Sequence, residues 1–323
     1  MMAAARPVHA LSLWRRLLIA LIRGFYFRRA RALNFAPQGD RPRLLLCSHR
    51  NGAIDGYVVL SACPRAQFTL SAQLLRNPLL RLMFSGIPVV RAKDRQRYSM
   101  RRGDFPDPMD AICAHLRAGG ALAFFPEGGS EWGHAPLPYQ SGHARVVRRL
   151  LEEGVPLEVV PLGLFYRRPD AFRSEVEVLA GDSIDLPPRG AEETPRQWEK
   201  RLKRIMGTAL DAVSVHCPDQ ETFARVERLA ATQADTATDD ASYVAYPFLV
   251  VFALLFAPVL LAGGYAGKKA DGRNTITFFR MIGGLAAALL WLPVLLVLFG
   301  FYPLLFSVLW LMAWAGWRNF PEV

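Results

Sequence analysis

Two long runs of apolar residues near the C-terminal end restrict the architecture of this chain more than any other feature. No charged residue occurs between Asp240 and Lys268, or between Arg280 and Arg318. A transmembrane helix needs about 20 consecutive apolar residues, so the first run is long enough for one span. The second is too long for one ordinary span, and a Gly-Phe-Tyr-Pro sequence divides it near its middle. We therefore expect residues 243–323 to form membrane segments.

The loop between the two runs carries a strong positive charge. Lys268, Lys269, Arg273 and Arg280 stand against the single Asp271. The positive-inside rule places such a loop in the cytoplasm. This conflicts with a cytoplasmic soluble domain followed by a single crossing of the first run. Re-entrant or hairpin insertion of the runs would remove the conflict, and the sequence leaves the topology open.

The first residues of the chain have the pattern of a basic amphipathic helix, which we predict over residues 1–36. The apolar residues on its one face are Leu11, Trp14, Leu18, Leu21, Ile22 and Phe25. Arginines interrupt the apolar residues, so we expect no secretory signal peptide. An ordinary helix packed on a core is the alternative, but the density of arginines favours the bilayer surface.

The formal net charge of +11 favours a polyanionic partner. Because the chain has apolar runs and no motif that reads nucleic acid, the expected partner is a lipid bilayer and not a nucleic acid. Cys47, Cys63, Cys113 and Cys217 lie far apart and form no C-x-x-C pair. We interpret them as small buried side chains in a reducing compartment.

Short apolar segments alternate with amphipathic ones over residues 37–229, which is typical of an α/β domain. Strands are expected at 44–47, 67–70, 87–90, 121–125, 157–165 and 175–179. Helices are expected at 54–62, 74–84, 106–117, 142–152 and 195–213. The predicted fold is a mixed, largely parallel sheet flanked by helices. Residues 230–242, rich in Ala, Thr and Asp, are expected to be a linker or a frayed helix before the membrane segments.

Two prolines refine this pattern. Pro88 removes a backbone donor from its strand, which indicates an end or edge position in the sheet. Pro195 suits the first position of a helix, with Thr194 before it as the N-cap.

His49 and Asp55 are the candidate catalytic pair. His49 follows the strand at 44–47, where an imidazole can take a proton from a hydroxyl nucleophile. A nearby carboxylate can accept the other ring N–H and fix the tautomer. A spacing of six does not align two residues on one helix face. The pair therefore requires a turn between them, which Gly52 permits, with Asp55 in the first helical turn.

Three further segments contain polar or glycine residues next to strands. Arg91 follows the strand at 87–90 and is suited to hold a phosphate by paired hydrogen bonds. Glu127, Gly128 and Gly129 form a turn after the strand at 121–125, where α/β proteins place their sites. The strand at 157–165 is expected to shape the site or to pack in the core.

Together these four segments resemble the motif blocks of the glycerol-3-phosphate and lysophosphatidate acyltransferase superfamily, in the right order over roughly residues 40–185. The His-x5-Asp spacing of His49 and Asp55 is similar to the subgroup that includes fungal glycerol-3-phosphate acyltransferases. The commoner Thr-Arg after Pro-Glu-Gly is Gly129-Ser130 here, and Gln140 and Ser141 replace basic residues. These departures leave the acceptor open.

The resemblance implies direct acyl transfer from acyl-CoA or acyl-carrier protein to the hydroxyl of a phosphorylated glycerolipid acceptor. His49 would be the general base and Asp55 its partner. The residues implied in substrate binding are Arg50, Arg91, Glu127, Gly128 and Gly129. No metal or other cofactor is implied. The expected location is the membrane, with the catalytic domain on its cytoplasmic face.

Two alternatives remain. Glu127, Glu131, His134 and His143 are of metal-ligand type, but without an H-E-x-x-H pattern a metal-dependent hydrolase is disfavoured. A non-catalytic, membrane-anchored lipid-binding protein is the second alternative. The intact pair of His49 and Asp55 argues against it.

Overall fold

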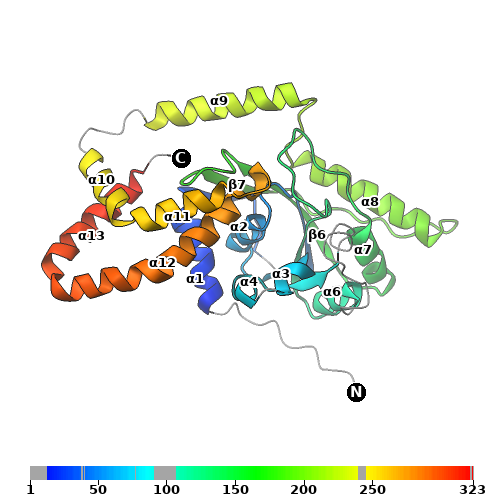
Figure 1. Cartoon of the computed structure of the whole chain (residues 1–323). Coiled ribbons are helices and arrows are strands. Elements are labelled where there is room, and N and C mark those ends of the chain that lie inside the picture. Colours follow the sequence, from blue (N-terminus) through cyan, green and yellow to red (C-terminus); the bar gives the residue numbers. More distant parts are fainter. Residues whose placement is uncertain are drawn as a thin grey trace, which may run out of the picture.

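A computed structural model describes residues 13–37, 39, 41–76, 78–90, 107–238, 245–320 and 322 (Figure 1). Its centre is a seven-stranded sheet in the order β1-β7-β6-β2-β5-β3-β4. The strands are β1 Arg29–Leu33, β2 Arg43–Cys47, β3 Ala66–Ser71, β4 Ile87–Val89, β5 Ala121–Phe124, β6 Glu158–Tyr166 and β7 Glu175–Ala180. Among these described strands, only β6 and β7 pair antiparallel. The predicted mixed, largely parallel α/β sheet is thus confirmed, and β4 with Pro88 lies at its edge.

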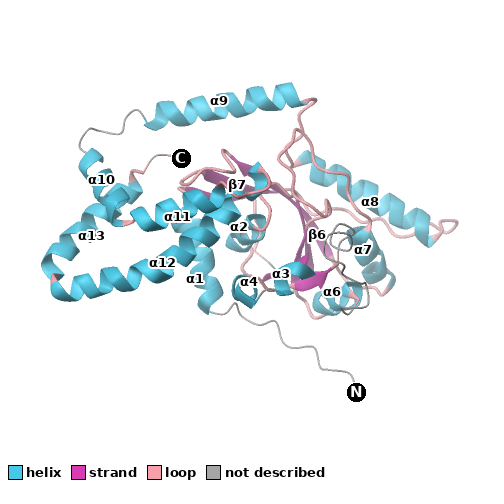
Figure 2. Ribbon diagram, viewed as in Figure 1, coloured by secondary structure: helices cyan, strands magenta, loops and turns pink. Residues whose placement is uncertain are grey.

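Helices cover both faces of the sheet (Figure 2). They are α2 Ile54–Ala62, α3 Ala72–Arg76, α4 Pro78–Met83, α6 Pro108–Arg117, α7 Gly142–Glu152 and α8 Pro195–Ala212. Alternate residues of the buried β2 enter different cores: Leu45 lies in the core beneath α2, and Leu44 in the core beneath α6, α7 and α8. Because both faces are covered, β2 is apolar almost throughout.

Most elements lie where the sequence predicts them, and α2 and α7 have the predicted bounds. A reciprocal capping box at Thr194 begins α8, with Pro195 at its start. The helix predicted at 74–84 is described as two segments, α3 and α4. Position 77 between them lies outside the described residues, and Pro78 opens α4.

The predicted N-terminal helix ends earlier than residue 36, and its residues 1–12 lie outside the described part of the chain. The described part consists of α1 Leu13–Leu21 and a π-helical turn, η1 Ile22–Tyr26, after which the chain becomes β1. Alanine and arginine are good helix formers, but pairing with β7 overrides this propensity in β1. In α1, Leu18 is buried against the core whereas Leu17 is exposed. The helix therefore packs on the domain and also presents an apolar surface.

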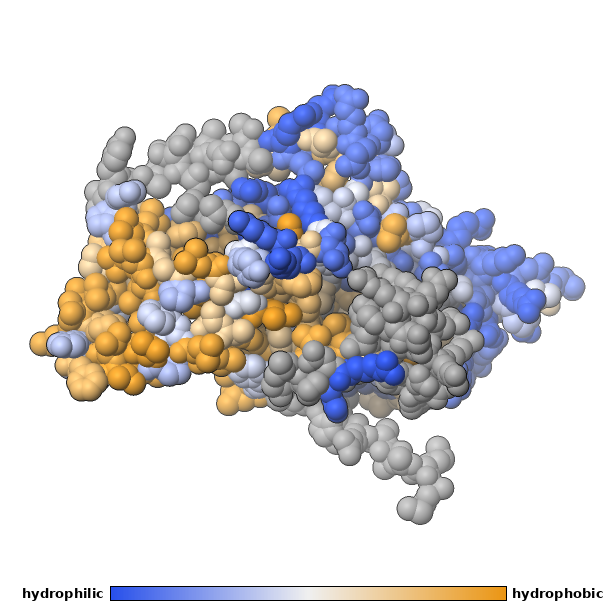
Figure 3. Space-filling model, in the orientation of Figure 1, coloured by the Kyte–Doolittle hydropathy of each residue, from blue (hydrophilic) through white to orange (hydrophobic). Residues whose placement is uncertain are grey.

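The C-terminal part is helical. Its elements are α9 Gln220–Thr238, α10 Tyr246–Leu255, α11 Ala257–Gly267, η4 Arg273–Thr275, α12 Ile276–Phe301 and α13 Pro303–Arg318. The linker predicted at 230–242 overlaps the end of α9. By length and composition, one described helix, Arg273–Phe301, is able to cross a membrane, and the pair α10–α11 passes the same test only as a span bent by 75°. Apolar side chains gather on this part of the surface (Figure 3).

The basic loop between the apolar runs is docked on the α/β domain. Arg273 lies 3.2 Å from a carboxylate oxygen of Asp170 and donates to Glu227 of α9 at 2.7 Å. The side chain of Asn274 donates to the backbone carbonyl of Ser130 at 2.8 Å. The segment from η4 into α12 therefore lies against the turn that follows β5.

Candidate functional site

The turn between β2 and α2 holds the candidate pair at the carboxyl end of the central strand. Ser48 extends the pairing with β6, since its N–H donates to Leu162 at 2.9 Å and its hydroxyl accepts from the N–H of Leu164. The chain then reverses at Gly52, whose φ of 53° is in the left-handed region that favours glycine. This turn brings Asp55, in the first turn of α2, back towards the strand.

His49 and Asp55 meet as the spacing requires. Nδ1 of His49 lies 2.8 Å from Oδ2 of Asp55. The histidine side chain is 15% exposed and the aspartate side chain is fully buried. The ring of Phe125 packs against the imidazole at a centroid distance of 4.5 Å. Because the aspartate occupies Nδ1, Nε2 is the ring atom available for proton exchange with a substrate.

The Asp55 carboxylate receives three more hydrogen bonds. Its Oδ2 accepts from the backbone N–H groups of Arg50 and Asn51 at 2.7 and 2.8 Å, and its Oδ1 accepts from the Tyr166 hydroxyl at 2.5 Å. Burial, with the nearby charge of Asp55, raises the pKa of Tyr166 well above its usual value, so this hydroxyl remains a donor. These donors offset the cost of burying the carboxylate. The contact with Tyr166 was not predicted.

Glu127 fixes the backbone on the other side of His49. Its Oε1 accepts from the N–H of His49 at 2.7 Å, and its Oε2 accepts from the N–H of Leu137 at 2.9 Å. Burial raises the pKa of Glu127, and the two backbone donors partly oppose that shift. The carboxylate thus ties the His49 turn to the loop after β5. Glu127 was expected to contact a substrate, and in this arrangement it reaches the site through His49.

The two glycines after Glu127 form the turn that the sequence suggested. Gly128 has a φ of 68°, and its N–H donates to the Phe125 carbonyl at 3.1 Å. Gly129 is buried. Both follow Glu127, the residue that accepts the hydrogen bond from the backbone N–H of His49.

Of the two arginines predicted to bind phosphate, the structure describes Arg50 but not Arg91. Arg50 is 2% exposed, and its guanidinium stacks on Trp132 at 4.6 Å and on Phe223 at 5.5 Å. Its Nη1 donates to the carbonyl of Gly133 at 2.9 Å, while Nε and Nη2 have no partner among the described residues. Burial lowers the pKa of Arg50, with Glu127 and Asp55 opposing the shift.

Two residues of the metal-hydrolase alternative, Glu127 and His143, have other contacts or surroundings in the described part of the chain. No group of three or more His, Cys, Asp or Glu residues gathers there as a metal site. Both oxygens of Glu127 accept backbone hydrogen bonds. His143 is buried in α7, and burial, assisted by the positive charge of Lys203, lowers its pKa to about 4. A neutral, buried His143 is consistent with a packing role.

The start of α12 covers the His49 turn, which sequence reasoning did not anticipate. A Cβ added to Gly52 would lie 3.0 Å from the backbone oxygen of Asn274. The Pro169 carbonyl accepts from the Asn51 side chain at 2.9 Å and also from the hydroxyl of Thr277. The C-terminal segment is therefore part of the wall of the site.

Comparison with known proteins gives a family match whose residues include His49, Asp55 and Glu127. Residues 21–164 match the family model described as Acyltransferase. Glycerol-3-phosphate O-acyltransferase 1 of Saccharomyces cerevisiae is 33% identical over 135 residues, which are 39% of this chain and 18% of that protein. Glycerol-3-phosphate O-acyltransferase 2 of the same yeast is 27% identical over 125 residues, covering 37% and 17%. An uncharacterized acyltransferase of Schizosaccharomyces pombe is 31% identical over 120 residues, covering 35% and 18%. The chain therefore spans less than a fifth of each of these relatives.

The variant Gly52→Ala tests the packing of this turn. An alanine in the left-handed region costs about 1 kcal/mol, and the Cβ of residue 52 also meets the backbone of Asn274. We expect a loss of unfolding free energy greater than that of Gly154→Ala. Gly154 is the matched control, because its φ is 71° and its added Cβ meets nothing within 4 Å. Equal losses in denaturant titrations of the detergent-solubilised variants would contradict the contact with Asn274.

Proposed function

We propose that this chain, which belongs to the acyltransferase family through its residues 21–164, transfers a fatty acyl group from a thioester to a glycerolipid precursor. The donor is acyl-CoA or acyl-carrier protein, and the acceptor is the hydroxyl of a glycerol phosphate or a lysophospholipid. One observation carries the proposal. The imidazole of His49 is held through Nδ1 by a buried carboxylate, at the partly exposed carboxyl end of the central strand.

In the proposed reaction, Nε2 of His49 removes the proton of the acceptor hydroxyl as the oxygen attacks the thioester carbonyl. Asp55 accepts the Nδ1–H, fixes the tautomer and stabilises the imidazolium. The tetrahedral intermediate then collapses, the carbon–sulfur bond breaks, and the imidazolium returns its proton to the departing thiolate. The products are the ester and the free thiol. No acyl-enzyme forms and no metal takes part.

The groups that bind the substrates are assigned from the resemblance and from their location. Arg91 and Arg50 remain candidates for the phosphate of the acceptor. For Arg50, the support is a buried guanidinium with two nitrogens that have no partner among the described residues. Its use would require the ligand to reach between Trp132 and Phe223. We expect Gly128 and Gly129 to let substrate approach the backbone beside His49.

The proposed role of His49 is tested by release of free CoA thiol from acyl-CoA with a panel of glycerol-phosphate and lysophospholipid acceptors. We expect His49→Ala to lower turnover by at least about 100-fold, the usual worth of a general base. The variant His216→Ala is the matched control, since His216 is exposed and lies outside the site. Near-normal turnover in a folded, membrane-bound His49→Ala protein would remove the proposal. No thiol release by the native protein with any acceptor would favour the lipid-binding alternative.

We further propose that the C-terminal helices enter the bilayer as hairpins and return to the side of the α/β domain. The 16 residues of α13 extend about 24 Å, which is less than the roughly 30 Å of a hydrocarbon core. The first turns of α12, through Leu285, pack on the protein core and leave a similar length free. Arg273 pairs with the α/β domain, and the Arg318 carbonyl accepts from Arg173. Both contacts support a return of the chain to one side.

Cysteine labelling in sealed vesicles tests this topology. Two variants are made in a Cys217→Ser background: Lys268→Cys, and His216→Cys in the α/β domain as the control. Each is treated with a membrane-impermeant maleimide. The hairpin arrangement predicts that both react from the same side, because the loop after α11 docks on the domain. Reaction from opposite sides would show that α10 and α11 form one crossing, and would overturn the arrangement.

A further inference from the structure

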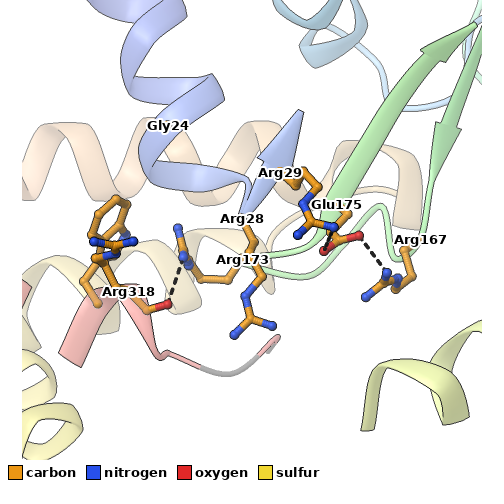
Figure 4. A pocket seen from close by; sticks show the side chains of 8 residues that line it. Gly24, Arg28, Arg29, Arg167, Arg173, Glu175 and Arg318 are labelled. Atoms are coloured by element: carbon orange, nitrogen blue, oxygen red, sulfur yellow. Dashed lines mark hydrogen bonds and ion pairs between the residues drawn. The ribbon is translucent and has the colours of Figure 1, made fainter. Parts of the chain in front are cut away.

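A basic pocket lies apart from the His49 turn, between the N-terminal segment, the β6–β7 connection and the end of α13 (Figure 4). It is a cavity of about 490 Å³, within the range of small-molecule sites. Its lining side chains include five arginines, Arg28, Arg29, Arg167, Arg173 and Arg318, together with Trp317 and Glu175. The pocket is therefore built from three segments that are distant in sequence.

Carboxylates balance only part of this charge. Glu175 lies 2.6 Å from Arg167 and 3.9 Å from Arg29, and Glu322 lies 4.0 Å from Arg167. The other three arginines, Arg28, Arg173 and Arg318, form no ion pair with any described residue. Guanidinium groups that converge without a counter-charge repel one another, and an anion between them relieves that repulsion.

Arg173 has the features of a residue built into a binding site. It is 5% exposed, and its backbone has a φ of 66°, which is strained for a residue other than glycine. Its guanidinium stacks on Trp317 at 4.5 Å, and Nη2 donates to the Arg318 carbonyl at 3.3 Å, while the buried Nε has no partner among the described residues. Burial and the neighbouring Arg28 and Arg318 lower its pKa to about 10. Its charge is thus costly without a ligand.

The pocket lies near both the candidate site and the apolar helices. Arg167 directly follows Tyr166, whose hydroxyl binds Asp55, and the Pro169 carbonyl in the same connection binds Asn51. On its other side, Trp317 and Arg318 end the apolar α13. Tryptophan and arginine in this position are typical of the level of the lipid headgroups. A ligand here would sit where the protein meets the membrane surface.

We propose that this pocket binds a phosphate group, held by the guanidinium groups of Arg28, Arg173 and Arg318. Arginine forks match phosphate oxygens in paired hydrogen bonds and keep their charge when buried. The phosphate belongs either to a lipid at the bilayer surface or to a soluble phosphate ester. The proposal concerns binding alone and does not depend on the reaction assigned to His49.

The test uses the full chain purified in detergent micelles. Phosphatidic acid and phosphatidylcholine are titrated as micellar probes, and glycerol 3-phosphate and inorganic phosphate as soluble ones, with binding followed by thermophoresis. We expect saturable binding of phosphatidic acid, of the soluble phosphates or of both, and none of phosphatidylcholine. Binding of phosphatidic acid without competition by the soluble probes identifies a lipid source, whereas competition identifies a soluble phosphate. No binding of any phosphate probe overturns the proposal.

Variants locate the bound phosphate. Arg28→Gln, at an exposed position, is expected to weaken binding by about tenfold or more, the usual effect of losing a charged hydrogen bond. Arg173→Lys keeps the positive charge but loses the paired donors of the guanidinium, and it is also expected to weaken phosphate binding. Arg31→Gln is the matched control, because Arg31 is on β1, pairs with Glu177 at 3.8 Å and lies outside the pocket. Equal weakening by Arg28→Gln and Arg31→Gln would overturn the proposal. Binding to these variants is measured without an acyl donor, which separates this result from the test of acyl transfer.

Discussion

The carboxylate of Asp55 accepts four hydrogen bonds, from the His49 ring, two backbone N–H groups and the Tyr166 hydroxyl. A buried charge of this kind is stable only when its donors are already in position. The turn at Gly52 supplies the backbone donors, and β6 supplies the tyrosine. Glu127, a second buried carboxylate, accepts a hydrogen bond from the backbone N–H of His49. Two buried carboxylates therefore hold His49, Asp55 through the imidazole and Glu127 through the backbone N–H, and the position of the free ring nitrogen follows from them.

The C-terminal segment depends on the same turn. Asn51 and Thr277 share the Pro169 carbonyl, and Asn274 packs over Gly52. The apolar helices are thereby fixed to the wall of the site. In the proposed hairpin arrangement, a substrate in the bilayer would approach His49 along these helices. The basic pocket around Arg173 occupies the other end of this connection. The pairing of β1 with β7 brings four of its arginines together, and the docking of α13 adds Arg318.

Much of the fold follows from local patterns. Short apolar segments with glycine or proline at their ends predict β2, β5 and β6, and the six-residue spacing with Gly52 predicts the contact of His49 with Asp55. Other features have no local signal. β1 has the composition of a helix and becomes a strand only because β7 offers an edge. The burial of Arg50 depends on its contact with Phe223, and the turn at Gly52 is covered by Asn274. These contacts join residues more than 140 positions apart, so no periodicity in the sequence reports them.

The central claim is that Asp55 holds His49 with a proton on Nδ1 and leaves Nε2 free to act as a base. Nitrogen NMR of the detergent-solubilised protein with labelled histidine tests it most directly, with His49→Gln to assign the signals. At a pH where the imidazole is neutral, the account predicts a protonated Nδ1 and a bare Nε2 for His49. A bare Nδ1 with the proton on Nε2 would contradict it, because that ring has no base to offer a substrate on its open side.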